Sequence, residues 1–128
     1  MPVLDSLRQL LTLLLSYGFL LLANGLFTTL LSLRTDMEGF SSLLIGVVMG
    51  GYYLGLFLGA RYAAAVVNQV GHIRAFGVFA SLLSITPLIH TLFVSPPLWM
   101  ALRLLAGFSM AGLIVVTESW LNARVENS

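Results

Sequence analysis

Apolar residues gather in four long runs that short polar segments separate. The runs cover residues 10–33, 43–66, 76–94 and 98–120. Each is about 20 residues or longer, the length that a helix needs to cross roughly 30 Å of hydrocarbon. Membrane β-strands are roughly ten residues long and alternate in polarity, whereas these leucine-rich runs do not alternate. The pattern predicts an all-α, polytopic membrane bundle of four transmembrane helices.

The connections between the runs are short, at residues 34–39, 68–74 and 95–97. Short connections force neighbouring helices to run antiparallel. The last one contains Pro96 and Pro97, which suit a break between helices because the residue before a proline avoids helical dihedrals.

Arginine counting predicts the orientation of the bundle. With antiparallel helices, four arginines fall on one side of the membrane, and Arg34 falls on the other. The four are Arg8, Arg61, Arg74 and Arg124. Cytoplasmic loops carry the excess of basic residues, so we expect both termini in the cytoplasm.

The composition agrees with a lipid environment. Hydrophobic residues make up 59% of the chain and charged residues 9%, and the mean hydropathy is +0.99. Soluble domains average about 45–50% apolar and roughly 25% charged residues. The net charge of +1 provides no basic field for nucleic acid. The lipid bilayer is therefore the expected partner, and no nucleic acid is expected.

The sequence contains no residue pattern that is typical of a catalytic site or a metal site. The chain has no cysteine, which excludes disulfides and thiolate sites. His72 and His90 lie far apart and have no carboxylate at ligand spacing. No phosphate-binding loop and no nucleophile–base pair occurs. We predict a protein that is not an enzyme and that needs neither metal nor cofactor.

Small residues recur every fourth position in the second run, at Gly51, Gly55, Gly59 and Ala63. In lipid, such a stripe lets two helix backbones approach closely. The pattern predicts ordinary helix packing, or a sliding contact between two moving halves. Smooth small-residue faces suit both.

Arg103 lies inside the fourth run, where a charge costs at least about 2.5–3.5 kcal/mol at the bilayer centre. One interpretation is that its side chain reaches back to the nearby interface. The other is a polar partner inside the bundle. Asn24 and Thr28 lie one turn apart on the first helix, at a depth that roughly matches Arg103. A contact between Arg103 and the first helix is therefore a hypothesis for the transport cavity.

Five other polar or aromatic residues stand out. Tyr52 and Tyr53 lie near the middle of the second run, away from the interfaces where tyrosine is usual. One of the two faces the centre of the bundle, and the sequence does not say which. His90 reads as an interfacial residue, and Trp99 and Trp120 read as interface anchors.

Glu118 lies near the cytoplasmic end of the fourth run. An ion pair with Arg74, Arg61 or Arg124 is the favoured interpretation, and proton coupling is the alternative.

Two segments resemble motifs of the major facilitator superfamily of transporters. Its loop between the second and third helices reads Gly-x-Leu-x-Asp-Arg-x-Gly-Arg-Arg, and here Gly71 stands at the second glycine, followed by His72 and Arg74. Asn68 and Gln69 stand where the family has aspartate and arginine, which weakens the charge-relay role of the loop.

On the fourth helix the family has Arg-x-x-x-Gly followed by small residues. The run Arg103-Leu-Leu-Ala-Gly107 and the later Ala111 fit this pattern well. In the family this arginine faces the first helix and the central cavity and is often linked to proton coupling. The whole chain is similar to a poorly characterised bacterial subgroup.

The resemblance implies a partial fold of this superfamily, in which residues 1–128 form an incomplete amino-terminal half. The missing helices of the complete transporter would then be partners. The implied function is movement of a small solute across the bacterial inner membrane, coupled to protons. Two alternatives stay open: a small four-helix oligomeric exporter, and a membrane subunit that does not transport.

Overall fold

The computed structural model describes residues 2–126, with side chains through residue 123. Those residues form four α-helices, which are α1 (Pro2–Met37), α2 (Ser42–Val70), α3 (His72–Leu92) and α4 (Pro96–Glu126). No strand occurs in this part of the chain. All four helices are long and apolar enough to cross a membrane. The prediction of an all-helical chain with four candidate membrane spans is confirmed.

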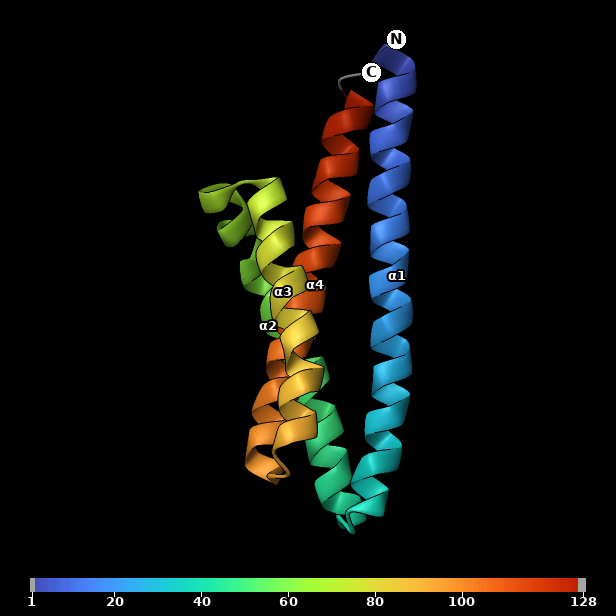
Figure 1. Cartoon of the computed structure of the whole chain (residues 1–128). Helices are drawn as coiled ribbons and strands as arrows, with labels where there is room; N and C mark the ends of the chain where they lie inside the picture. The colour runs from blue at the N-terminus through green and yellow to red at the C-terminus, as the bar shows by residue number, and fades with distance from the viewer. Residues whose placement is uncertain (1, 127–128) are drawn as a thin grey trace.

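The helices run alternately up and down, so the start of α1 and the end of α4 lie at the same end of the molecule (Figure 1). Helix α4 is the centre of the fold, because α2 packs along it and α3 packs beside it. In the most apolar window of each helix, 61% of α4 is buried, against none of α1. Figure 1 shows α1 joined to the others near the α1–α2 turn and diverging from α2 and α3 beyond it.

The helices are longer than the apolar runs predicted, because polar residues continue them beyond the hydrocarbon-length segment. Helix α1 begins eight residues before the predicted start and ends only at Met37. It ends in a Schellman motif, in which Gly39 has a φ of 79° and the Phe40 and Gly39 amides donate to the Thr35 and Asp36 carbonyls. Ser41 then caps α2, because its hydroxyl accepts from the Leu44 amide at 3.2 Å.

The second break is also narrower than predicted, and the third has the predicted width but lies two residues earlier. Only Gly71 separates α2 from α3, and its φ of 90° explains why glycine stands there. Pro96 and Pro97 do not form the third break, as the sequence suggested, but open α4. Proline suits the first turn of a helix because that turn has no acceptor for its missing amide. The break itself covers residues 93–95.

Glycine residues set the distance between α2 and α4. A methyl group added at Gly55 would collide with the Leu104 carbonyl, and one at Gly107 would collide with the Tyr52 carbonyl. At Gly59 the added carbon would lie 2.6 Å from the Ala111 Cβ. Gly51 approaches the Met100 carbonyl in the same way. The small residues of both helices thus lie in one backbone-to-backbone contact.

Pro87 lies inside α3, where a proline normally leaves a carbonyl one turn earlier without its amide donor. Here that carbonyl belongs to Leu83, and the buried hydroxyl of Thr86 donates to it at 3.0 Å. The threonine therefore replaces the missing backbone bond, which matters most where no water can do so.

We expect Thr86→Val, which keeps the side-chain shape, to lower the free energy of unfolding by about 1–3 kcal/mol, the cost of a buried group left without a partner. Unfolding in detergent, followed by circular dichroism, measures the change. Ser84→Ala is the matched control, because Ser84 donates to the Ala80 carbonyl, which a regular helix already satisfies with a backbone amide. Equal losses in the two variants would contradict this role of Thr86.

Candidate transport site

Arg103 lies on α4, roughly 10 Å along the helix from Pro96, and is 1% exposed. Its Nη2 donates to the Thr28 hydroxyl of α1 at 3.3 Å. Its guanidinium carbon lies 4.6 Å from the centroid of the Tyr52 ring of α2, a cation–π distance. The side chain does not reach back to the interface, since two helices cover it inside the bundle.

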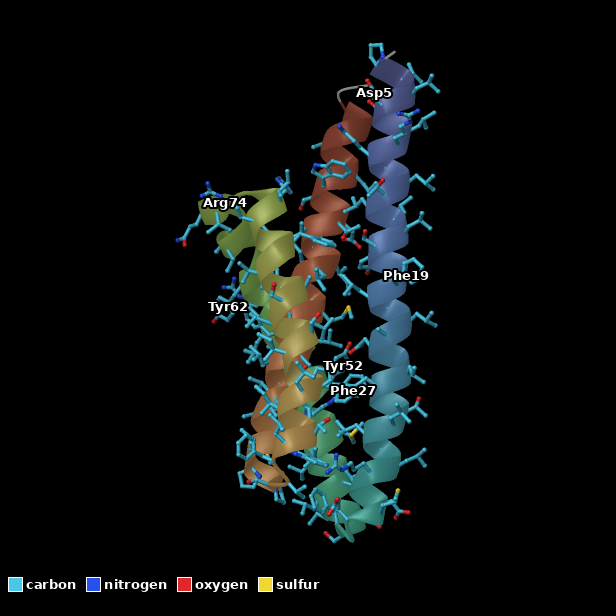
Figure 2. All side chains as sticks on the ribbon, in the orientation of Figure 1. Asp5, Phe19, Phe27, Tyr52, Tyr62 and Arg74 are labelled. Carbon is cyan, nitrogen blue, oxygen red and sulfur yellow. The ribbon has the colours of Figure 1, made fainter. Side chains whose placement is uncertain are left out.

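Asn24 completes this group of residues, because its Nδ2 donates to the Tyr52 hydroxyl at 3.0 Å. Asn24 and Thr28 are one turn apart and present both polar groups on the side of α1 that faces α2 and α4. Tyr52 is the tyrosine that faces the interior (Figure 2), whereas Tyr53 is 69% exposed and meets it edge to face. The structure thus brings Asn24, Thr28, Tyr52 and Arg103 together and leaves Tyr53 outside.

The Arg103 guanidinium has more donors than acceptors. Its Nε and Nη1 are buried and have no hydrogen-bond partner. Within the described part of the chain no carboxylate pairs with it, and the ion pair found there joins Arg34 to Glu38 at 3.5 Å. A buried charge without a counter-ion is costly and is retained in membrane helices mainly for function.

His90 is buried beside this group, at 2% exposure, so its side chain faces the neighbouring helices and not lipid or water. Its ring packs against Phe27 with centroids 5.4 Å apart and against Trp99 at 5.2 Å. Both ring nitrogens lack a hydrogen-bond partner. His90 therefore adds an unsatisfied polar group that sequence reasoning missed.

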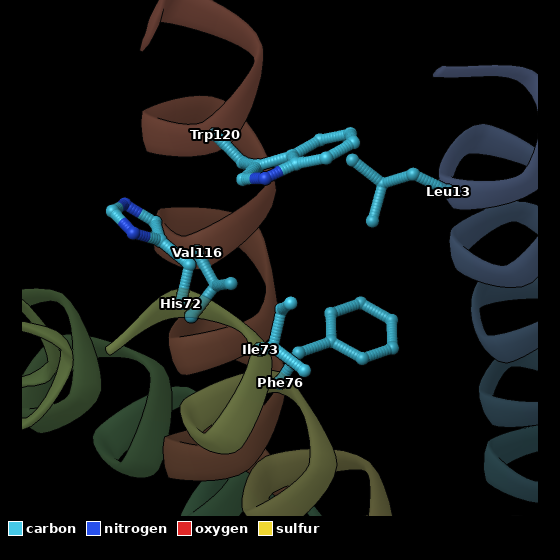
Figure 3. Close-up of a pocket in the computed structure, with 6 residues that line it drawn as sticks. All are labelled: Leu13, His72, Ile73, Phe76, Val116 and Trp120. Atoms are coloured by element: carbon cyan, nitrogen blue, oxygen red, sulfur yellow. The ribbon is translucent and has the colours of Figure 1, made fainter. Parts of the chain in front are cut away.

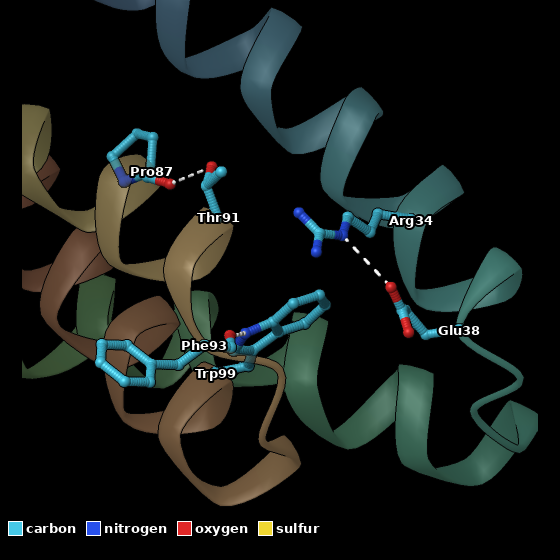
Figure 4. Close-up of polar contacts among 6 residues, drawn as sticks. All are labelled: Arg34, Glu38, Pro87, Thr91, Phe93 and Trp99. Atoms are coloured by element: carbon cyan, nitrogen blue, oxygen red, sulfur yellow. Dashed lines mark hydrogen bonds and ion pairs between the residues drawn. The ribbon is translucent and has the colours of Figure 1, made fainter.

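Trp99 is also internal and is no interface anchor, because its side chain is completely buried. Its indole Nε1 donates to the Phe93 carbonyl at 2.6 Å, which ties α4 to the end of α3 (Figure 4). Arg34 lies over the same indole, 5.6 Å from the ring centroid. The α3 end, packed beside α4, covers the tryptophan that the sequence alone suggested as an anchor at the membrane interface.

A cavity of about 260 Å³ lies between α1 and α3, next to this group. Asn24 is in its wall, so this side chain separates the cavity from Tyr52. Ser84 adds a second polar group to the wall, and the remaining lining is apolar. The remaining lining residues are Leu20, Ala23, Phe27, Leu83 and Pro87.

The loop residues singled out in the sequence lie toward the end that carries the termini. Asn68 and Arg74 are exposed and Gly71 forms the break. His72 lines a cavity of about 140 Å³ with Leu13, Trp120 and neighbouring apolar residues (Figure 3). The structure therefore places this segment apart from Arg103.

Glu118 does not join that segment either. Its side chain is exposed, and among the described side chains it forms no ion pair with Arg61 or Arg74. The side chain of Arg124, the third candidate partner, lies outside the described residues.

A double-mutant cycle measures the link between α1 and α2. Tyr52→Phe removes the hydroxyl and keeps the ring over Arg103, and Asn24→Ala removes the amide. We expect a coupling free energy of about 1 kcal/mol between the two changes, the usual value of a net hydrogen bond. This coupling free energy is measured by unfolding titrations in detergent of the parent, the two single variants and the double variant. Strictly additive losses would show that the bond contributes nothing.

Comparison with known proteins supports a role in transport. A 77-residue part, or 60% of the chain, is 32% identical to "Putative metabolite transport protein YyaJ" of Bacillus subtilis (strain 168). The chain spans 17% of the length of that relative. No family model matches the chain, and no solved structure matches it. With its four candidate spans, the similarity indicates a multi-pass membrane protein related to transport and points away from an enzyme.

Proposed function

We propose that this chain is part of a secondary transporter of the major facilitator type, which moves a small metabolite across the bacterial inner membrane by coupling to protons. The observation that carries the proposal is the buried Arg103 at the junction of α1, α2 and α4. An intramembrane charge without a counter-ion is a functional-site hypothesis by default. The resemblance to a metabolite transport protein supports it.

The polar contacts between α1 and the other helices are those expected of a helix that moves during transport. In the most apolar segment of α1, no residue is buried. Side-chain hydrogen bonds join it to the other helices at Asn24 and Thr28. Helix α2, by contrast, is held to α4 by backbone-to-backbone contact. In the proposal, α1 opens and closes the path while α2 and α4 stay together, and both termini are cytoplasmic. Helices outside this chain complete the path.

Proton movement in proteoliposomes tests the proposal. The longest reading frame that contains this chain is reconstituted with pyranine inside, and panels of small metabolites are added outside under an inward proton gradient. We expect at least one panel to increase proton entry, and Arg103→Ala to abolish that increase. Arg61→Ala is the control, because Arg61 is exposed. Metabolite uptake that ignores the gradient would contradict proton coupling.

The same assay on the 128-residue chain alone separates the alternatives. Uptake by the four helices alone would favour a small oligomeric exporter. No uptake by either chain, together with a stoichiometric partner after purification, would favour a subunit that does not transport.

A further inference from the structure

We infer that Arg103 anchors a small carboxylate anion, which is the transported solute of the proposed function on which this inference rests. The reasoning begins with the donors of the guanidinium. Arginine has five N–H groups on a planar guanidinium. Four of them form two edges, Nε with Nη2 and Nη1 with Nη2, and the two N–H bonds of each edge point in parallel. Thr28 accepts one hydrogen of Nη2. Whichever hydrogen it takes, one complete edge remains without an acceptor, because Nε and Nη1 have none.

A carboxylate is the group that matches such an edge, since its two oxygens accept two parallel N–H bonds. The positive charge of Arg103 has no counter-ion among the described side chains. The Tyr52 ring beneath the guanidinium offers only its π face, which partly offsets the charge but accepts none of the remaining hydrogens in the plane. An anion would supply both the missing charge and the missing acceptors.

The surroundings favour a small molecule over the carboxylate of a further helix. Nε and Nη1 have practically no accessible surface, so an additional helix packed outside this bundle does not reach them. A cavity of about 260 Å³ is already present on the other side of Asn24. It lies between α1, the loosely held helix, and α3. Movement of α1 would break the Asn24–Tyr52 and Thr28–Arg103 bonds together and join this cavity to the guanidinium.

His90 strengthens the assignment of a polar solute. Its ring nitrogens are both unpartnered and lie on the neighbouring helix, α3. A solute with a second polar group beside its carboxylate can use them. The predicted ligand is therefore a small acid, and an uncharged molecule of the same shape should bind much more weakly, because it leaves Arg103 unpaired.

Binding without a gradient tests this inference separately from transport. Lactate, pyruvate, succinate and benzoate are each compared with the corresponding amide by isothermal titration of the longest reading frame in detergent. We expect at least one acid to bind at least tenfold more tightly than its amide and than inorganic phosphate. Arg103→Lys keeps the positive charge but loses the two parallel N–H donors, so it should weaken that binding at least tenfold. Arg61→Lys should leave the binding unchanged.

A second measurement uses the unaltered protein, in case the variants do not fold. Phenylglyoxal modifies accessible arginines, and mass spectrometry reports each site. We expect the bound acid to slow modification of Arg103 at least threefold and to leave Arg61 unaffected. Equal affinity for acids and amides, or an Arg103 that phenylglyoxal never modifies, would overturn the inference. An acid that binds at Arg103 but is not moved would contradict the proposed function alone, and uptake of uncharged solutes only would contradict this inference alone.

Discussion

Gly55→Ala is expected to lower the free energy of unfolding by about 3 kcal/mol, at the upper end of the usual cost of overpacking. The added carbon would collide with the Leu104 carbonyl and lie 2.8 Å from the Phe108 amide. Both are backbone atoms of α4, which cannot rotate away as a side chain can. The two helices must separate, and their contact holds the fold together. Thermal or chemical unfolding in detergent, followed by circular dichroism, measures the loss.

Gly50→Ala is the matched control on the same helix. Gly50 is exposed, and an added methyl group would meet nothing within 4 Å. Since alanine is favoured over glycine in helices by about 1 kcal/mol, this variant should be as stable as the parent or slightly more so.

Gly107→Ala should resemble Gly55→Ala, because its added carbon would collide with the Tyr52 carbonyl from the other side. The double variant should lose less than the sum, since helices already separated have room for the second methyl group. Full stability of Gly55→Ala would show that the close approach of α2 and α4 is not needed for the fold.

Arg103→Met is expected to raise the free energy of unfolding by about 1–3 kcal/mol while it reduces gradient-driven uptake at least 100-fold. The buried guanidinium leaves Nε and Nη1 unsatisfied and has no counter-ion among the described side chains. Replacing such a buried charge by an apolar side chain of similar volume is often neutral or stabilising. Methionine is long and flexible enough to fill the same space. Unfolding in detergent and the proteoliposome assay measure the two effects on the same preparation.

Arg61→Met controls for the loss of a positive charge. Arg61 is exposed, and its guanidinium lies over the ring of the adjacent Tyr62. A surface change of this kind should alter stability by no more than about 0.5 kcal/mol, and uptake should persist. If Arg103→Met instead unfolded the protein and lost uptake only in proportion to the unfolded fraction, Arg103 would be a structural residue.

The four helices could be predicted from the sequence because a membrane span needs a long apolar run, and run length is a local property. Counting residues from the helix ends also placed Asn24 and Thr28 at the depth of Arg103. The depth of a residue follows from the rise per residue and needs no knowledge of packing. The small-residue stripe at Gly51, Gly55 and Gly59 could likewise be read from its spacing.

The helix ends could not be read from hydropathy. Polar residues continue a helix outside the hydrocarbon, and hydrogen-bonded caps decide where it ends. The Gly39 motif and the Ser41 hydroxyl mark the first break. Pro96 is the first residue of α4, although a proline at this place in the sequence is equally compatible with a break between helices.

Only the tertiary structure decided which side chains meet. Tyr52 and Tyr53 are neighbours with the same chemistry, and the rotation of α2 against α4 turns one inward and leaves the other exposed. His90 and Trp99 stand near the ends of their runs, yet contacts between helices cover both. Hydropathy along a chain shows which segments lie in the membrane. Rotation about the helix axis and contact with a neighbour are set by packing, which joins residues far apart in sequence.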